Sequence, residues 1–167
     1  MNLRKLKSIR APFYKVFLFW KEKFECPICG YCGPFKDKKT RMHAKCPSCG
    51  ELERARLHAL VLNDILKKRE LSSLSVLHFA PENYFREFLQ KSAKKYVSAD
   101  LFRKDVDLQC DVQSIPCSDG EFDLVFASHV LEYPEDDLLA MKEIYRVISG
   151  GGGMAILTVP LMHSCTV

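Results

Sequence analysis

The sequence repeats one five-residue phrase, Cys-Pro-x-Cys-Gly, at Cys26–Gly30 and again at Cys46–Gly50. Sixteen residues separate the second cysteine of the first copy from the first cysteine of the second copy. Each copy places two thiolates on a tight turn, and two such turns at this spacing are typical of a zinc site. Four sulfur ligands complete a tetrahedron and leave no open position. The spacing therefore predicts a structural Zn²⁺ ion held by Cys26, Cys29, Cys46 and Cys49.

Two nearby residues leave the ligand set open. Cys32 forms a further C-x-x-C pair with Cys29, and His43 lies close to the second copy of the phrase. We favour the four cysteines that share the repeated phrase, and the alternative is a group of buried thiols without a metal. The other cysteines are scattered and are interpreted as ordinary small apolar residues: Cys110, Cys117 and Cys165.

The net charge of +4 is unevenly distributed along the chain. Residues 1–60 contain 14 Lys and Arg against 5 Asp and Glu, whereas residues 61–167 contain 11 against 16. A basic first part favours an anionic partner, such as nucleic acid, a lipid surface or a phosphorylated substrate. A solvated basic surface is the alternative.

Residues 1–24 form a basic amphipathic segment in which Phe13, Phe17 and Trp20 follow at spacings of four and three. One interpretation is a helix that rests on anionic lipid, and the other is a helix whose apolar face packs on the protein itself. The apolar run Ala11–Trp20 is interrupted by a lysine and is shorter than the about 20 residues that cross a bilayer. No signal-peptide cleavage site follows this run, so we expect a cytoplasmic protein with reduced cysteines.

The pattern of apolar residues divides the remaining chain in two. We expect a zinc ribbon and a following helix over residues 25–70, and the apolar spacing puts Leu57, Leu60, Val61 and Leu66 on one stripe of that helix. In residues 72–167, short apolar runs alternate with helical stretches. The expected strands are 76–80, 95–99, 122–128 and 153–159, and the expected helices are 84–92 and 136–148. This alternation predicts an α/β fold with a parallel sheet and helices on both faces.

Three stretches in this second part resemble the class I S-adenosylmethionine-dependent methyltransferases. They are Phe122–Tyr133, the run Ala140–Ile148 with the glycines after it, and Met154–Pro160. The resemblance spans residues 76–160 and implies a Rossmann-like parallel sheet with flanking helices. It also implies an S-adenosylmethionine-dependent methyltransferase that acts on a small molecule, a sugar or a lipid precursor.

The resemblance also implies which residues bind the cofactor. Asp100 would bind the ribose hydroxyls, Asp111 would accept from the adenine amino group, and the Val112 amide would donate to the adenine ring. His129 would lie near the methionine part. The full expected set is Ala80, Pro81, Glu82, Asp100, Leu101, Asp111, Val112 and His129. Both aspartates have a simpler alternative as helix caps or turn residues, but their places at the ends of successive strands favour binding.

The turn after the first strand departs from the family pattern. It reads Phe-Ala80-Pro81-Glu82-Asn83 and has no glycine, and Pro81 supplies no amide hydrogen. A similar turn is found in members of the family that carry a zinc knuckle. His78 stands where many members carry an acidic residue, and the alternative is a buried, hydrogen-bonded histidine.

The chain ends at Val167, seven residues after Pro160, where the family fold continues with further strands. We therefore expect a C-terminally incomplete class I methyltransferase fold, with an exposed edge strand that could join another copy of the chain. No residue is assigned as catalytic, although His129 and Glu132 are the first candidates for a general base. The alternative functions are a non-catalytic zinc-ribbon protein that contacts nucleic acid or anionic membrane, and an inactive, truncated methyltransferase.

Overall fold

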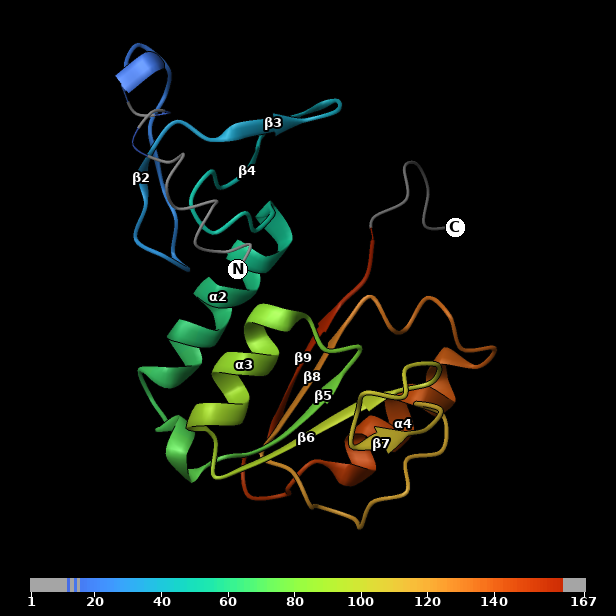
Figure 1. Cartoon of the computed structure of the whole chain (residues 1–167). Helices are drawn as coiled ribbons and strands as arrows, with labels where there is room; N and C mark the ends of the chain where they lie inside the picture. Colours follow the sequence, from blue (N-terminus) through green and yellow to red (C-terminus); the bar gives the residue numbers. More distant parts are fainter. Residues whose placement is uncertain (1–11, 13, 15, 161–167) are drawn as a thin grey trace. The chain divides into compact units, whose positions relative to one another are not determined.

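The computed structural model describes Pro12, Tyr14 and residues 16–160, and it divides into two compact units, Met1–Lys68 and Arg69–Val167. Figure 1 shows the elements of both units, and we describe each unit separately. Most of the predicted basic segment, including Phe13, lies outside the described residues, as do Cys165 and the rest of the last seven residues. Within the described part, no helix has the length and apolar character needed to cross a membrane.

The elements of unit 1 from Phe24 onward are two small antiparallel hairpins and a helix. Strand β1 (Phe24–Glu25) pairs with β2 (Cys32–Gly33), and β3 (Lys36–Lys38) pairs with β4 (Arg41–Lys45). Helix α2 (Glu53–Leu66) follows. A small core joins the cysteine turns to the hairpins through Cys26, Tyr31, Phe35 and Cys46, with Phe24, Ile28 and Cys49 packed against them.

Arg56 ties helix α2 to the hairpins of unit 1. Its guanidinium donates to the main-chain oxygens of Ala44 at 2.8 Å and His43 at 3.2 Å, and it lies 4.5 Å from the centre of the Phe35 ring. These contacts satisfy backbone carbonyls that a two-strand sheet leaves unpaired. One basic side chain thus holds the turn of the second cysteine pair against the helix that follows it.

The apolar stripe expected on α2 is not the buried face of this helix. Its buried residues are Ala55, His58, Ala59 and Leu62, whereas Leu57 and Leu60 are both 55% exposed and Val61 is also exposed. Apolar residues occur around much of this helix, so the spacing admits more than one stripe. Which face is buried depends on packing in the folded chain, and the spacing does not record that packing.

Unit 2 is a five-stranded parallel sheet with helices on both faces, which confirms the predicted fold class. Its sheet has the order β7-β6-β5-β8-β9. The elements are the 3₁₀ turn η1 (Leu71–Ser73), β5 (Ser75–Phe79), α3 (Asn83–Ser92), β6 (Lys95–Asp100), β7 (Leu108–Gln109), β8 (Leu124–Ser128), α4 (Asp137–Val147) and β9 (Met154–Thr158).

Strand β8 shows why the strands read as unbroken apolar runs. All of its five residues are buried. Val125 and Ala127 share a core cluster with Ile144 of α4, whereas Phe126 meets Phe85 of α3 in an edge-to-face contact with centres 5.3 Å apart. Because a helix covers each face, residues on both sides of the strand must be apolar.

His78 lies in this core. It is fully buried, stacks on the Phe126 ring with centres 4.8 Å apart, and has its Nδ1 atom 3.1 Å from the Tyr96 hydroxyl. Burial raises the pKa of that tyrosine to about 12. The structure therefore shows His78 as the buried, hydrogen-bonded histidine of the alternative interpretation.

The strand order places a topological switch between β5 and β8. From β5 the chain first adds β6 and β7 on one side of the sheet, and it then returns to add β8 and β9 on the other side. Loops that leave the carboxyl ends of β5 and β8 run apart, and open α/β sheets bind ligands in the crevice this creates.

Candidate functional site

The four cysteines of the repeated phrase come together in unit 1. Their Sγ atoms all lie within 4.8 Å of one another, with 3.7 Å between Cys26 and Cys49 and 3.7 Å between Cys29 and Cys46. Cys32 and His43 do not belong to this group among the residues that the structure describes. Four thiolates at these separations fit the tetrahedral sulfur coordination of a structural zinc ion.

The glycine after each cysteine pair is required by the turn. Gly30 has a φ of 66° and Gly50 a φ of 80°, and their amides donate at 2.9 Å to the carbonyls of Cys26 and Cys46 respectively. Other residues rarely adopt this left-handed conformation, because their Cβ atoms clash with the backbone. The two turns are alike, so the repeated phrase produces the repeated geometry.

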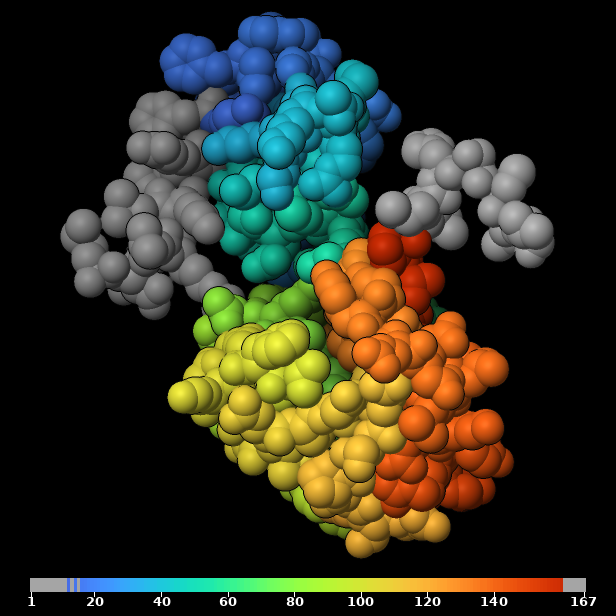
Figure 2. Space-filling model, turned by 90° about the vertical axis from the view of Figure 1, so that its right-hand side faces the viewer, coloured from blue at the N-terminus to red at the C-terminus, as the bar shows by residue number. Residues whose placement is uncertain are grey.

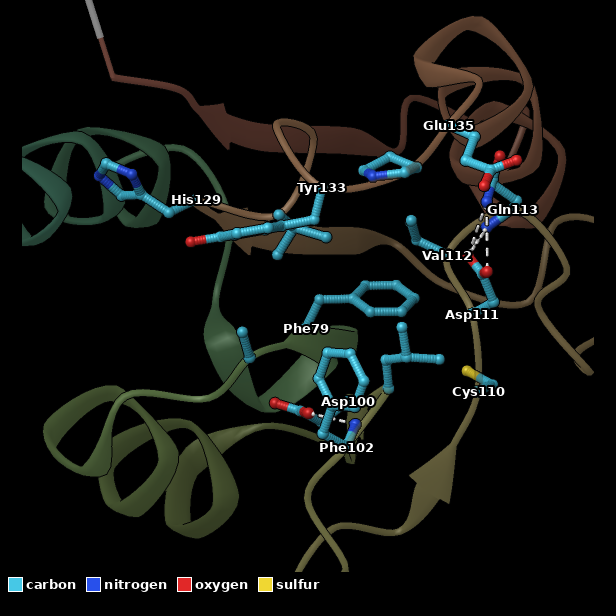
Figure 3. A pocket seen from close by; sticks show the side chains of 14 residues that line it. Phe79, Asp100, Phe102, Cys110, Asp111, Val112, Gln113, His129, Tyr133 and Glu135 are labelled. Carbon is cyan, nitrogen blue, oxygen red and sulfur yellow. Dashed lines mark hydrogen bonds between the residues drawn. The ribbon is translucent and has the colours of Figure 1, made fainter.

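Unit 2 contains a cavity of about 520 Å³ at the carboxyl ends of β5, β6 and β8, at the topological switch (Figure 3). Of the residues expected to bind a cofactor, the cavity brings together Ala80, Asp100, Leu101, Asp111, Val112 and His129. Pro81 and Glu82 do not line it. Its other walls include the aromatic residues Phe79, Phe102 and Tyr133.

Asp100, the last residue of β6, is both a turn residue and a cavity residue. Its Oδ1 atom accepts from the amides of Phe102 at 2.8 Å and Arg103 at 2.9 Å, which fixes the side chain. Its Oδ2 atom accepts no hydrogen bond from the described residues and remains available to a ligand in the cavity. The two interpretations of this aspartate are therefore compatible.

Asp111 lies in the same cavity and is held by Gln113. The Gln113 amide nitrogen of the main chain donates to Asp111 Oδ1 at 2.8 Å, and the side-chain Nε2 atom lies 3.3 Å and 3.2 Å from the two carboxylate oxygens (Figure 3). The Gln113 Oε1 atom accepts from the amide of Asp136 at 3.0 Å. Sequence reasoning missed Gln113, because its bond to Asp136 spans 23 positions and leaves no local pattern.

The glycine-free turn after β5 is held in place by residues outside the turn. Ala80 has a φ of 47° and donates its amide to Ala99 O at 2.8 Å, so this amide is not free for a ligand. Arg103 Nη1 donates to the Pro81 carbonyl at 2.8 Å, and Arg103 Nη2 lies 2.7 Å from Asp105. Arg103 and Arg86 hold the pKa of the Asp105 carboxyl well below its usual range. Arg103 was also missed by sequence reasoning, because an arginine in a loop carries no distinctive signal.

Comparison with known protein families agrees with this geometry. Residues 81–156 match a family model described as a methyltransferase domain. This part of the chain is therefore similar to a methyltransferase domain. The match includes Asp100, Asp111 and His129, and it begins directly after the left-handed residue Ala80.

This chain aligns with about half the length of two solved methyltransferase structures. A putative methyltransferase from Bacillus halodurans is 22% identical, with 59% of this chain and 44% of that chain covered and a TM-score of 0.47. An S-adenosylmethionine-dependent methyltransferase from Mesorhizobium loti is 19% identical, with 60% and 52% covered and a TM-score of 0.48. The chain thus spans about half the length of the solved structures that it matches. No curated protein matches it.

In unit 2, His129 follows β8 and lies at the end of the cavity opposite Asp111 (Figure 3). Its φ is 54°, and its amide donates to Thr158 O of β9 at 2.9 Å. The Nδ1 atom of its ring lies 2.9 Å from Glu132 Oε1. If Nδ1 carries the ring proton, it donates a hydrogen bond to Glu132, and Nε2 is left as a proton acceptor, which is the arrangement of a general base.

Proposed function

We propose that unit 2 binds S-adenosylmethionine in the cavity and transfers its methyl group to a small molecule, a sugar or a lipid precursor. The observation that carries this proposal is the meeting of Asp100 and Asp111 in one cavity, at the ends of neighbouring strands. The cavity volume of about 520 Å³ lies within the usual range for small-molecule sites, about 300–1,000 Å³.

The two carboxylates suit the two polar ends of an adenosine. Asp100 Oδ2 would accept from a ribose hydroxyl, while Oδ1 keeps the side chain in place. Asp111 would accept from the adenine amino group, and the amide of Val112, which donates to no other described residue, would donate to the ring. The methionine part would then extend past Ala80 toward His129.

Methyl transfer needs alignment more than acid–base assistance. The sulfonium supplies an activated methyl group: the acceptor's electron pair forms the new bond to carbon as the carbon–sulfur bond breaks, which leaves S-adenosylhomocysteine. This chain's residues would orient the two reactants, and orientation alone removes much of the barrier. Where the acceptor carries a proton, His129 would take it at Nε2 while Glu132 stabilises the charged ring.

Calorimetric titration with S-adenosylhomocysteine tests the cofactor site. We expect saturable binding to the wild-type protein and at least about a tenfold weaker affinity for Asp100→Asn, because a hydrogen bond to a charged group contributes about 1.5–3 kcal/mol. Asparagine can still accept from the amides of Phe102 and Arg103, so the turn is kept. Asp137→Asn, an exposed substitution on α4, is the matched control and keeps wild-type affinity. A wild-type protein that gives no binding heat would reject the proposal.

Transfer itself is tested with S-adenosylmethionine labelled in its methyl group and fractionated extracts of small molecules and lipids. We expect the label in one fraction, and a lower rate with His129→Asn if the acceptor needs deprotonation. An unlabelled extract together with intact cofactor binding would argue for a protein that binds the cofactor without transferring its methyl group.

For unit 1 we propose a structural zinc ion bound by Cys26, Cys29, Cys46 and Cys49. The mutual approach of the four Sγ atoms to within 4.8 Å supports this assignment. Such a site supplies no chemistry, because all four positions around the metal are filled by protein. Its role would be to hold the two hairpins together, since unit 1 has a core too small to fold firmly without a cross-link.

A further inference from the structure

Four large apolar side chains stand exposed in one short stretch of unit 1. Val16 is 70%, Phe17 68%, Phe19 70% and Trp20 67% exposed, and the rings of Phe19 and Trp20 contact each other edge to face with centres 5.3 Å apart. We call Val16–Lys23 the aromatic segment, and Figure 2 shows it in blue at the surface of unit 1. Single exposed apolar residues need no explanation, but a contiguous group in water indicates an interaction site.

This exposure favours the lipid interpretation of the basic amphipathic segment. If its apolar face packed on the protein itself, Phe17 and Trp20 would be buried. Both are instead about two-thirds exposed. Phe13, the third member of the expected face, lies outside the described residues.

The charges around the aromatic segment are mainly positive. Lys21 and Lys23 follow the apolar run directly, are exposed, and form no ion pair among the described residues; Glu22 lies between them. Over residues 1–23 as a whole, the sequence has seven Lys and Arg against that single glutamate. An anionic partner therefore matches this part of the chain.

A second basic element lies beside Tyr14, two residues before the aromatic segment. The Nζ atom of Lys36, on β3, lies 4.7 Å from the centre of the Tyr14 ring. Lys38, the last residue of β3, and Lys39, in the turn that follows, are exposed and form no ion pair in the described part of the chain. Lys36 therefore adds a positive charge beside the residue that lies two positions before the aromatic segment.

The order of residues favours a bilayer over a nucleic acid. The lysines flank the apolar run rather than alternate with it, and the run includes the aliphatic Val16 and Leu18, which cannot stack on bases. Aromatic rings beside lysines suit the bilayer interface, where the rings enter the headgroup region and the cations meet anionic lipids. We propose that the aromatic segment docks unit 1 on an anionic lipid surface. This docking does not depend on methyl transfer.

Trp20 is the only tryptophan of the protein, so its fluorescence reports directly on this surface. The full-length protein is titrated with vesicles of phosphatidylcholine alone and with vesicles that also contain phosphatidylglycerol. We expect a blue shift of the emission, quenching by brominated lipid, and reversal at high salt, all with the anionic vesicles. An unchanged spectrum with both kinds of vesicle would overturn the proposal.

Two variants separate docking from a general effect on folding. Phe17→Ser/Phe19→Ser keeps the Trp20 reporter and should weaken vesicle affinity at least tenfold without lowering the melting temperature, because both side chains are exposed. The matched control, Leu138→Ser, removes a 61% exposed leucine from α4 and should bind vesicles like the wild type. Equal vesicle affinity for the double variant and the wild type would contradict the proposal.

A different partner of the aromatic segment would give different results in these experiments. A blue shift that depends on protein concentration, with a dimer in light scattering and no response to vesicles, would identify a second copy of the chain. A response to a single-stranded oligonucleotide and none to anionic vesicles would identify nucleic acid. Either result would overturn docking on lipid.

Discussion

Arg103 Nη1 lies 2.8 Å from the main-chain oxygen of Pro81, and this hydrogen bond joins the loop after β6 to the turn after β5. The arginine is itself held by Asp105, which also accepts from Arg86 at 2.9 Å. A glycine-rich turn keeps its shape through its own backbone. Here a side chain from a neighbouring loop fixes a turn that contains proline and a left-handed alanine.

Arg103 does not line the cavity, but its replacement should impair the proposed cofactor site because Arg103 fixes the turn after β5. We expect Arg103→Ala to weaken S-adenosylhomocysteine binding by about 1–2 kcal/mol, roughly five- to thirty-fold, because one hydrogen bond to the turn is lost. Adenosine, which lacks the part that would face this turn, should lose less affinity. Arg103→Lys should be intermediate, since lysine keeps the charge but not the planar fork that meets Asp105. Calorimetry with both ligands measures the difference, and equal losses for the two would contradict this role.

Removing the metal should unfold unit 1. We expect about one zinc per chain by elemental mass spectrometry, and none after Cys26→Ser, which changes a fully buried ligand. Cys32→Ser is the matched control, since Cys32 is exposed and outside the group of four, and it should keep the zinc. A chelator should likewise abolish the thermal transition of unit 1 in the wild type. Zinc loss in Cys32→Ser would show that the ligand set is different.

At Gly153, in the glycine run after α4, a side chain would clash with neighbouring atoms. A Cβ atom on Gly153 would lie 2.6 Å from Ile148 Cγ2 and 2.8 Å from Ser149 O. We expect Gly153→Ala to destabilise the protein by about 1–3 kcal/mol through overpacking. Gly150→Ala meets no atom within 4 Å and should be close to neutral. Urea denaturation of both variants measures the contrast, and similar midpoints would count against the packing argument.

The folded protein should lose stability in acid, because protonation of Glu143 weakens its interaction with Arg146. Arg146 binds both of its carboxylate oxygens at 2.8 Å and lowers the Glu143 pKa from 4.5 to about 2. Because the folded pKa lies below the unfolded one, this stabilisation is complete above about pH 4.5 and is lost as the pH falls toward 2. Glu143→Gln should therefore cost about 1 kcal/mol at neutral pH, a value kept small because solvent screens the partly exposed pair.

The loss of folding stability caused by Glu143→Gln should become smaller as the pH falls. Urea denaturation of Glu143→Gln and wild type across the acid range measures this convergence. Asp137→Asn, an exposed carboxylate on α4, should show no comparable trend. A difference that stays constant with pH would show that the carboxylate acts through packing rather than charge.

The sequence by itself determined the features that depend on neighbouring residues. The repeated Cys-Pro-x-Cys-Gly phrase specifies two tight turns, and the four thiols meet as predicted. The alternation of apolar runs and helical stretches specifies a parallel α/β sheet, because each strand is buried on both faces. Strand β7 was not predicted, since two residues, Leu108 and Gln109, are too few to show a period and form a strand only by pairing with Ala99 and Asp100.

Only the tertiary structure decided which residues act together across long separations. Gln113 binds Asp111 and the distant Asp136, and Arg103 supports Pro81 across 22 positions. Such contacts depend on how loops from different strands meet at one edge of the sheet, and no local spacing records that meeting. Exposure has the same origin: Phe17 and Trp20 have the spacing of a buried helical face, and only the packing of the folded chain leaves them in water.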